Sequence, residues 1–124
     1  MGSVPARLRP ASYADVRAAL AADPPSAEQT RLLVKHFLAV LAERAPGASV
    51  EVRVPPYAAV QAVAGVRHTR GTPPAVVELD AETWIALATG ALAWTEAEAS
   101  GRVRASGERA DLSPLLPLAS GEDA

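Results

Sequence analysis

The chain contains one long segment in which large apolar residues recur every three or four positions. Ser26 and Gln29 before it have the spacing of a capping box, and the sequence Ala-Pro-Gly at residues 45–47 ends the pattern. The recurring spacing places the apolar residues on one face of an α-helix. We therefore expect a long helix that lies flat against a sheet. Its apolar residues are Leu33, Val34, Phe37, Leu38 and Leu41.

A shorter helical pattern precedes this segment. Ser12 with Asp15 resembles a helix start, and Val16, Ala19 and Leu20 give a modest apolar face. The Asp-Pro-Pro sequence that follows stops the helix, because proline restricts the residue before it. Residues 1–10 show no periodicity, and we expect them to form a flexible arm.

The next segment alternates apolar and charged residues. Val50, Val52 and Val54 are separated by Glu51 and Arg53. Such alternation predicts a strand with one buried and one solvated face, which is typical of an antiparallel sheet covered on one side. We expect a second strand over residues 57–63. Residues 64–74 are predicted as a loop of which part can be strand.

The chain then repeats clear start and stop signals. Residues 76–79 are a short β-branched run, and Asp80 is placed to cap a helix that begins at Ala81. Leu79 and Trp84 have the spacing of a hydrophobic staple. Gly90 provides the left-handed residue that ends the helix at Thr89.

A second helix start follows closely. Thr95 with Glu98 has the spacing of a capping box, Trp94 precedes it, and Gly101 supplies the stop. Residues 102–106 alternate and predict a strand. An apolar closing segment follows, after which we expect residues 119–124 to be flexible. Its apolar residues are Leu112, Leu115, Leu116 and Leu118.

Composition narrows the class of protein. With 124 residues the chain forms one domain, residues 1–124, able to bury about two thirds of its unfolded surface. It has no cysteine, which excludes disulfides and cysteine catalysis, and its net charge of −2 argues against binding nucleic acid. We see no secretory signal and no apolar run that could span a bilayer. We expect a cytoplasmic protein without stable membrane insertion.

The final third carries a family resemblance. The run from Thr83 to Gly90, the segment from Ala97 to Val103, and residues 106–108 before a leucine-rich end resemble the C-terminal half of the sterol carrier protein type 2 family. The similarity is greatest to the small bacterial orthologues of that family. The resemblance implies an α+β domain with a largely antiparallel, five-stranded sheet and helices over one face. It also implies an apolar cavity for a lipid-like ligand, with no catalytic residues, no cofactor and no metal.

The apolar residues of the expected helices and strands are the candidates for lining such a cavity. The two tryptophans allow two interpretations: they fill the core between helix and sheet, or they line a hollow that takes up apolar ligands. The candidates are Leu33, Phe37, Leu41, Val52, Val54, Tyr57, Trp84, Leu87, Trp94, Val103, Leu112, Leu115 and Leu116.

One polar cluster is a candidate for a ligand head group. Arg67, His68 and Arg70 offer three donors within four residues, and such clustered donors favour a carboxylate or phosphate. The alternative is a solvated loop that pairs with Glu78 or Asp80.

Other titratable residues have structural explanations. His36 lies at the edge of the apolar stripe, and no carboxylate is spaced to complete a helix-borne metal motif with it. The carboxylates that could do acid/base work are expected in first turns of helices, where the helix dipole favours them. They are Asp80, Glu82, Glu96 and Glu98.

Two functions remain open at this point. The first is a non-enzymatic binding or carrier protein for an apolar ligand, for which a fatty acyl chain is easier to accommodate than a sterol because the chain lacks a lining rich in methionine and phenylalanine. The second is a protein interaction module or homodimer with a vestigial cavity and no lipid.

Overall fold

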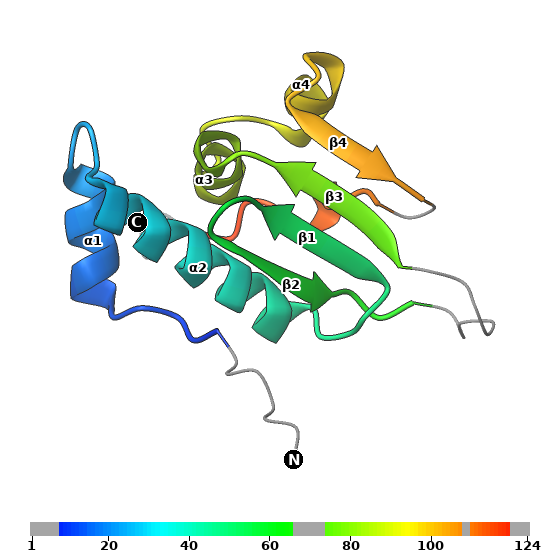
Figure 1. Ribbon diagram of the computed structural model, residues 1–124, viewed down its shortest axis with the longest axis horizontal. Coiled ribbons are helices and arrows are strands. Elements are labelled where there is room, and N and C mark those ends of the chain that lie inside the picture. Colours follow the sequence, from blue (N-terminus) through cyan, green and yellow to red (C-terminus); the bar gives the residue numbers. More distant parts are fainter. Residues whose placement is uncertain (1–7, 66–73, 108–109, 120–124) are drawn as a thin grey trace.

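The computed structural model describes residues 8–65, 74–107 and 110–119 of the chain (Figure 1). These residues form helices and strands in an order that defines an α+β domain. The elements are α1 (Tyr13–Ala21), α2 (Ala27–Arg44), β1 (Val50–Val54), β2 (Ala58–Ala62), β3 (Ala75–Leu79), α3 (Ala81–Thr89), α4 (Trp94–Ala99), β4 (Val103–Ser106) and a 3-10 helix, η1 (Ser113–Leu115).

The four described strands form one mixed sheet in the order β2-β1-β3-β4. The two outer pairs, β1 with β2 and β3 with β4, are antiparallel, whereas the central pair β1 and β3 is parallel. The prediction of a largely antiparallel, five-stranded sheet is therefore wrong in detail. Alternating burial reports that one face is covered, and this pattern does not depend on strand direction.

The predicted fifth strand has no counterpart in the part of the chain described. The stretch in which part of a strand was allowed, residues 64–74, lies mostly outside the described residues.

The sheet is covered on one face, as predicted. In β1 the three valines are fully buried, while Arg53 between them is exposed. Figure 1 shows α2 along the β2 side of the sheet, α4 beside β4, and the closing segment (red) behind the strands. The inward side chains of the sheet and the apolar stripe of α2 belong to a single core cluster.

The two N-terminal helices begin at the predicted caps. The Ser12 hydroxyl accepts a hydrogen bond from the Asp15 N–H at 3.1 Å. At the start of α2, Ser26 and Gln29 form a complete capping box, with reciprocal bonds of 3.0 and 2.9 Å. All five predicted stripe residues of α2 are buried.

The end of α2 is joined to the end of β2 by close backbone contact. The Val63 N–H donates to the Ala45 carbonyl at 2.6 Å. Gly47, at φ +148°, lies so close to this backbone that a Cβ would approach the Val63 carbonyl to 2.4 Å. Only glycine fits there without displacing the chain, so Gly47 sets how α2 leads into β1.

The helix α3 has the predicted bounds, but the start of α4 differs from the prediction. Asp80 Oδ1 accepts from the Thr83 N–H at 2.8 Å, and Gly90 ends the helix at φ +85°. In contrast, α4 begins at Trp94, and its N-cap is Ala93, which makes no side-chain bond. The predicted capping box of Thr95 and Glu98 is wrong, because Thr95 already lies inside the first turn.

The closing segment packs against α3. The N–H groups of Leu118 and Ala119 both donate to the Ala88 carbonyl, at 2.9 and 3.0 Å. Ala119 therefore does not belong to the expected flexible end. Within the described ranges, no helix combines the length and apolar character needed to cross a membrane.

Candidate functional site

The structure brings most of the predicted ligand residues together in the core. Ten of the thirteen are buried, and Tyr57, Leu115 and Leu116 are partly buried and pack against the same cluster. Tyr57 lies in the turn before β2 rather than in a strand, and its N–H donates to the Val54 carbonyl at 2.9 Å.

The space between α2 and the sheet is filled by side chains. Leu41, Val52 and Val54 each have an exposed fraction of 0%. Such a side chain touches neither bulk solvent nor an internal void large enough for one water molecule. The interior around these three residues is thus closely packed in this structure, as protein cores generally are.

A hollow of about 360 Å³ opens instead at the edge of the core, between α3, α4 and the closing segment. We call it the α3–α4 pocket. It brings together three of the predicted ligand residues, one from each of these elements: Leu87, Trp94 and Leu116. The rest of its lining is Gly90, Leu92, Ala93, Thr95, Ser113 and Pro117.

The two tryptophans stand in different surroundings. Trp84, fully buried in α3, donates from its Nε1 to the Val34 carbonyl of α2 at 3.3 Å. Its polar group is satisfied and it ties α3 to α2. For Trp84 the core-filling interpretation therefore describes what the structure shows.

Trp94 lines the α3–α4 pocket and is only 5% exposed. Its Nε1 is enclosed, and among the described residues no group accepts a hydrogen bond from it. A buried donor without an acceptor costs about 1–3 kcal/mol, so such groups are rare and often mark a site for water or a ligand.

A second hollow, of about 320 Å³, lies between the N-terminal segment, α1, α2 and the chain end at Leu118 and Ala119. His36 lies in its wall, half-buried, and its Nδ1 accepts from the Ala11 N–H at 2.9 Å. The position of His36 at the boundary of the apolar stripe agrees with the sequence interpretation.

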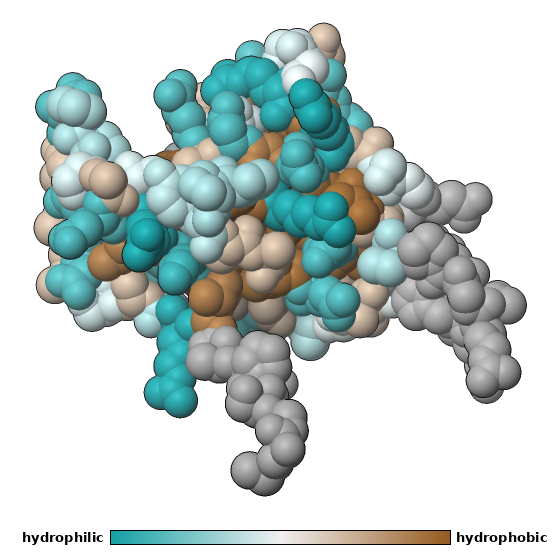
Figure 2. All heavy atoms as spheres, in the orientation of Figure 1, coloured by the Kyte–Doolittle hydropathy of each residue, from teal (hydrophilic) through white to brown (hydrophobic). Residues whose placement is uncertain are grey.

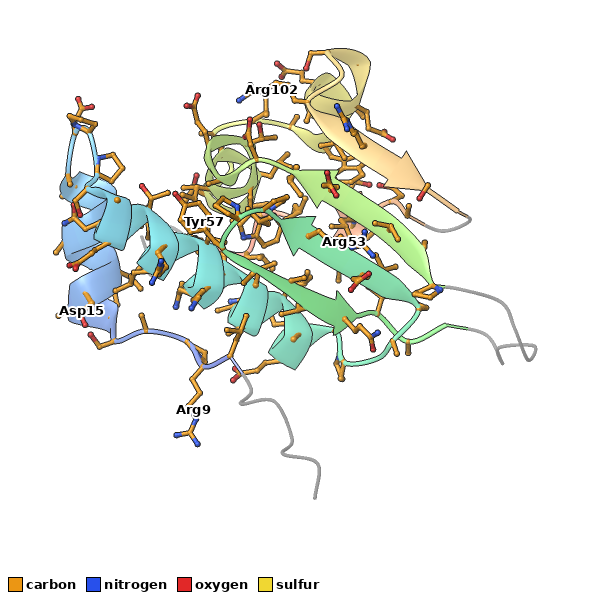
Figure 3. All side chains as sticks on the ribbon, in the orientation of Figure 1. Arg9, Asp15, Arg53, Tyr57 and Arg102 are labelled. Atoms are coloured by element: carbon orange, nitrogen blue, oxygen red, sulfur yellow. The ribbon has the colours of Figure 1, made fainter. Side chains whose placement is uncertain are left out.

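A third hollow, of about 440 Å³, lies at the end of β3 and β4 and has charged walls. Thr83, fully buried there, accepts from Arg102 Nε at 3.2 Å, and Arg102 lies beside α4 in Figure 3. Hydrogen bonds from the Thr83 N–H and hydroxyl, with the nearby Arg102 guanidinium, lower the pKa of Asp80 below its usual value. Because Glu78 and Arg104 also line it, the hollow has charges of both signs and no preference for an anion.

The predicted head-group residues cannot be placed in this arrangement. Arg67, His68 and Arg70 all lie outside the described residues. In the described ranges, no group of three or more His, Cys, Asp or Glu residues is arranged to hold a metal ion. Of the carboxylates assigned to first turns, Glu98 lies beyond the first turn of α4, because that helix begins earlier than predicted.

Sequence reasoning missed several residues of the α3–α4 pocket. Gly90, Leu92 and Ala93 belong to the turn between two helices, and Pro117 was read only as a break in the closing segment. The turn and the closing segment meet only through the tertiary fold. The one local signal was the dense run of apolar residues that surrounds both helix ends.

Fold and site together define a small α+β domain with a one-sided mixed sheet and an apolar pocket at the margin of its core, as in domains that bind small apolar molecules. A family model described as "Bacterial SCP ortholog" matches residues 26–118, which include every described element except α1. The chain therefore belongs to the bacterial orthologues of the sterol carrier protein family, as the resemblance indicated. No curated protein matches the chain.

Proposed function

We propose that this protein is a non-enzymatic binding or carrier protein for an apolar, lipid-like ligand, and that the ligand binds in the α3–α4 pocket. The observation that carries this proposal is the convergence of Leu87, Trp94 and Leu116 on one hollow from three separate elements. Membership of a family that consists generally of non-enzymatic carriers supports it.

The pocket favours a narrow ligand over a broad one. Its volume of about 360 Å³ is near the lower end of the range for small-molecule sites, about 300–1,000 Å³. A fatty acyl chain fits such a space more easily than a sterol. Each buried methylene contributes about 0.8 kcal/mol, so about ten of them reach micromolar affinity after the costs of association.

Titration of the variant Trp84→Phe with decanoate, palmitate and palmitoyl-CoA tests the proposal. In this variant Trp94 is the single tryptophan, so its fluorescence reports directly on the pocket. We expect a saturable change in emission with at least the two free acids. Native mass spectrometry of freshly purified wild-type protein should also show a bound species with the mass of a lipid.

Two matched variants locate the site. Leu116→Phe adds bulk to the α3–α4 pocket, and Val40→Phe adds the same bulk to the hollow beside α1, which has a similar volume. Both residues are partly buried, so neither change requires rebuilding the core. We expect Leu116→Phe to weaken acid binding about tenfold or more and Val40→Phe to leave it unchanged. Flat titrations with every lipid, or equal loss in both variants, would contradict the proposal.

The alternative, an interaction module that docks through its open sheet face, has less support. Across this face Arg53 pairs in register with Glu78, and Glu78 with Arg104. Arg53 also forms an ion pair with Glu51 at 2.7 Å. Figure 2 shows hydrophilic residues over much of the visible surface, with apolar areas between them, and Arg53 is labelled on the sheet in Figure 3. A solvated face accounts for this pattern, and sedimentation that shows a concentration-dependent dimer without lipid would favour the alternative instead.

A further inference from the structure

We infer that the α3–α4 pocket selects ligands that carry a hydrogen-bond acceptor next to their apolar chain, and that Trp94 Nε1 is the donor that recognises this acceptor. The inference rests on the proposed function and deepens it. The ligand class that follows is a single-chain lipid with a carboxylate or hydroxyl group, as opposed to a pure hydrocarbon or a lipid ammonium.

The first step of the argument is the contrast between the two indoles. Both are buried, at 0% for Trp84 and 5% for Trp94. The Trp84 donor has its acceptor in α2, whereas the Trp94 donor has none among the described residues. An unpaired donor in an apolar wall is unfavourable by itself, and it becomes favourable once a ligand supplies the missing oxygen.

The second step concerns the surroundings of Trp94 in the pocket. The neighbouring wall residues Leu87, Leu92 and Leu116 are apolar and offer no side-chain acceptor. The polar side chains of the lining are the hydroxyls of Thr95 and Ser113, and neither bonds to Nε1. A ligand chain thus meets apolar contacts along most of the wall and one strong polar preference at Trp94.

The third step is access, because Nε1 is enclosed in this structure. The wall formed by the closing segment is held by few bonds: Leu115 and Leu116 donate only within the segment, to Leu112 and Ser113. The bonds of the segment to α3 begin at Leu118. A small outward shift of Leu116 and Pro117 therefore opens a path to the indole without breaking the described bonds to Ala88.

The experiment compares three ten-carbon ligands on three proteins. The ligands are decanoate, 1-decanol and decylammonium, of which the last has no acceptor. The proteins are wild type, Trp94→Phe, which removes the donor and keeps an aromatic ring, and the control Trp84→Phe, whose donor is already engaged. Affinities are measured by calorimetry below the micelle concentration, and folding of each variant is checked by its amide spectrum.

We expect Trp94→Phe to weaken decanoate and decanol binding about tenfold, which corresponds to the loss of one hydrogen bond, and to leave decylammonium unchanged. Trp84→Phe should leave the ranking of the three ligands as in wild type. In wild type, decanoate should move the indole N–H resonance of Trp94 downfield and leave that of Trp84 in place. This last measurement needs no variant beyond those used for assignment.

The results separate the two levels of the argument. If the ligands bind but Trp94→Phe affects all three equally, or affects none, the inferred donor role is overturned and the carrier function stands. If none of the three binds wild-type protein, both are overturned. A Trp94 resonance that is unmoved by saturating decanoate also overturns the donor role.

Discussion

Two helices that follow each other directly in the sequence are built to different standards. α3 has a side-chain cap at Asp80, a left-handed glycine at its end, and a tryptophan whose donor is bonded to α2. α4 has no side-chain cap, spans only six residues, and presents a tryptophan whose donor is unpaired among the described residues. Both tryptophans belong to the same core cluster.

The contrast indicates where the fold is fixed and where it leaves room. Elements in which local signals, packing and hydrogen bonding all agree specify the architecture. Departures from this agreement tend to occur at functional sites. Here the missing cap and the unpaired donor occur in the same short helix, beside the apolar pocket.

Truncation of each tryptophan gives the largest effect. Trp84→Ala leaves a closed cavity in the core, and we expect it to lower the free energy of unfolding by about 3–5 kcal/mol. Trp94→Ala should cost at least about 1 kcal/mol less, because it enlarges an open pocket and removes an unpaired donor. Urea denaturation followed by circular dichroism measures both. Equal losses would show that the two regions are packed alike.

Replacement by phenylalanine isolates the two N–H groups. Both changes remove the same ring volume, but only Trp84→Phe breaks a hydrogen bond, to the Val34 carbonyl. We expect Trp84→Phe to be less stable than Trp94→Phe by about 1 kcal/mol, the net value of one such bond. The same urea experiment checks this difference. If Trp94→Phe is the less stable of the two, its indole has a partner in solution and the comparison fails.

Exchange of the helix caps should reduce the difference from both sides. Asp80 and Ala93 have similar extended backbone angles, φ −80° with ψ 169° and φ −82° with ψ 146°. Asp80→Ala should lower stability by about 1 kcal/mol, and Ala93→Ser should raise it by a few tenths to about 1 kcal/mol. Thermal unfolding of the two variants measures both changes. No gain from Ala93→Ser would mean that α4 does not start at Trp94 in solution.

The sequence predicted the well-specified region better than the other. Ser26 with Gln29, and Asp80 with Gly90, carry their signals within a few residues, and the helices they delimit were found where expected. At α4 the spacing of Thr95 and Glu98 matched a capping box, yet Trp94 is drawn into the core and the helix begins one turn-position earlier. Burial of a large ring outweighed a surface cap worth about 1 kcal/mol.

The sheet and the pocket show what local patterns leave out. The alternation of Val50, Val52 and Val54 predicted a one-sided sheet, and it contained no information on the parallel pairing of β1 with β3. The apolar residues of the core were recognised, but a filled interior and a hollow margin have the same composition. Only the meeting of the α3–α4 turn with the closing segment distinguishes them.

The pH dependence of the α3 cap gives the smallest expected effect. The pKa of Asp80 is lowered chiefly by the Thr83 N–H, with contributions from the Thr83 hydroxyl and Arg102. A folded-state pKa below the unfolded value of about 3.9 means that the charged cap stabilises the fold above this pH, and that its contribution is lost as the pH falls through the folded value.

Asp80→Asn keeps an oxygen at the cap position and removes the titration. We expect the variant to be less stable than wild type at pH 5–7 by under about 1 kcal/mol, because Asp80 is exposed and its charge is screened. The gap should close at about pH 2–3, where the wild-type carboxylate takes up its proton. Urea denaturation at pH 7, 5 and 3 measures it. A gap that stays constant over this range would show that the oxygen geometry of the cap, and not its charge, fixes the start of α3.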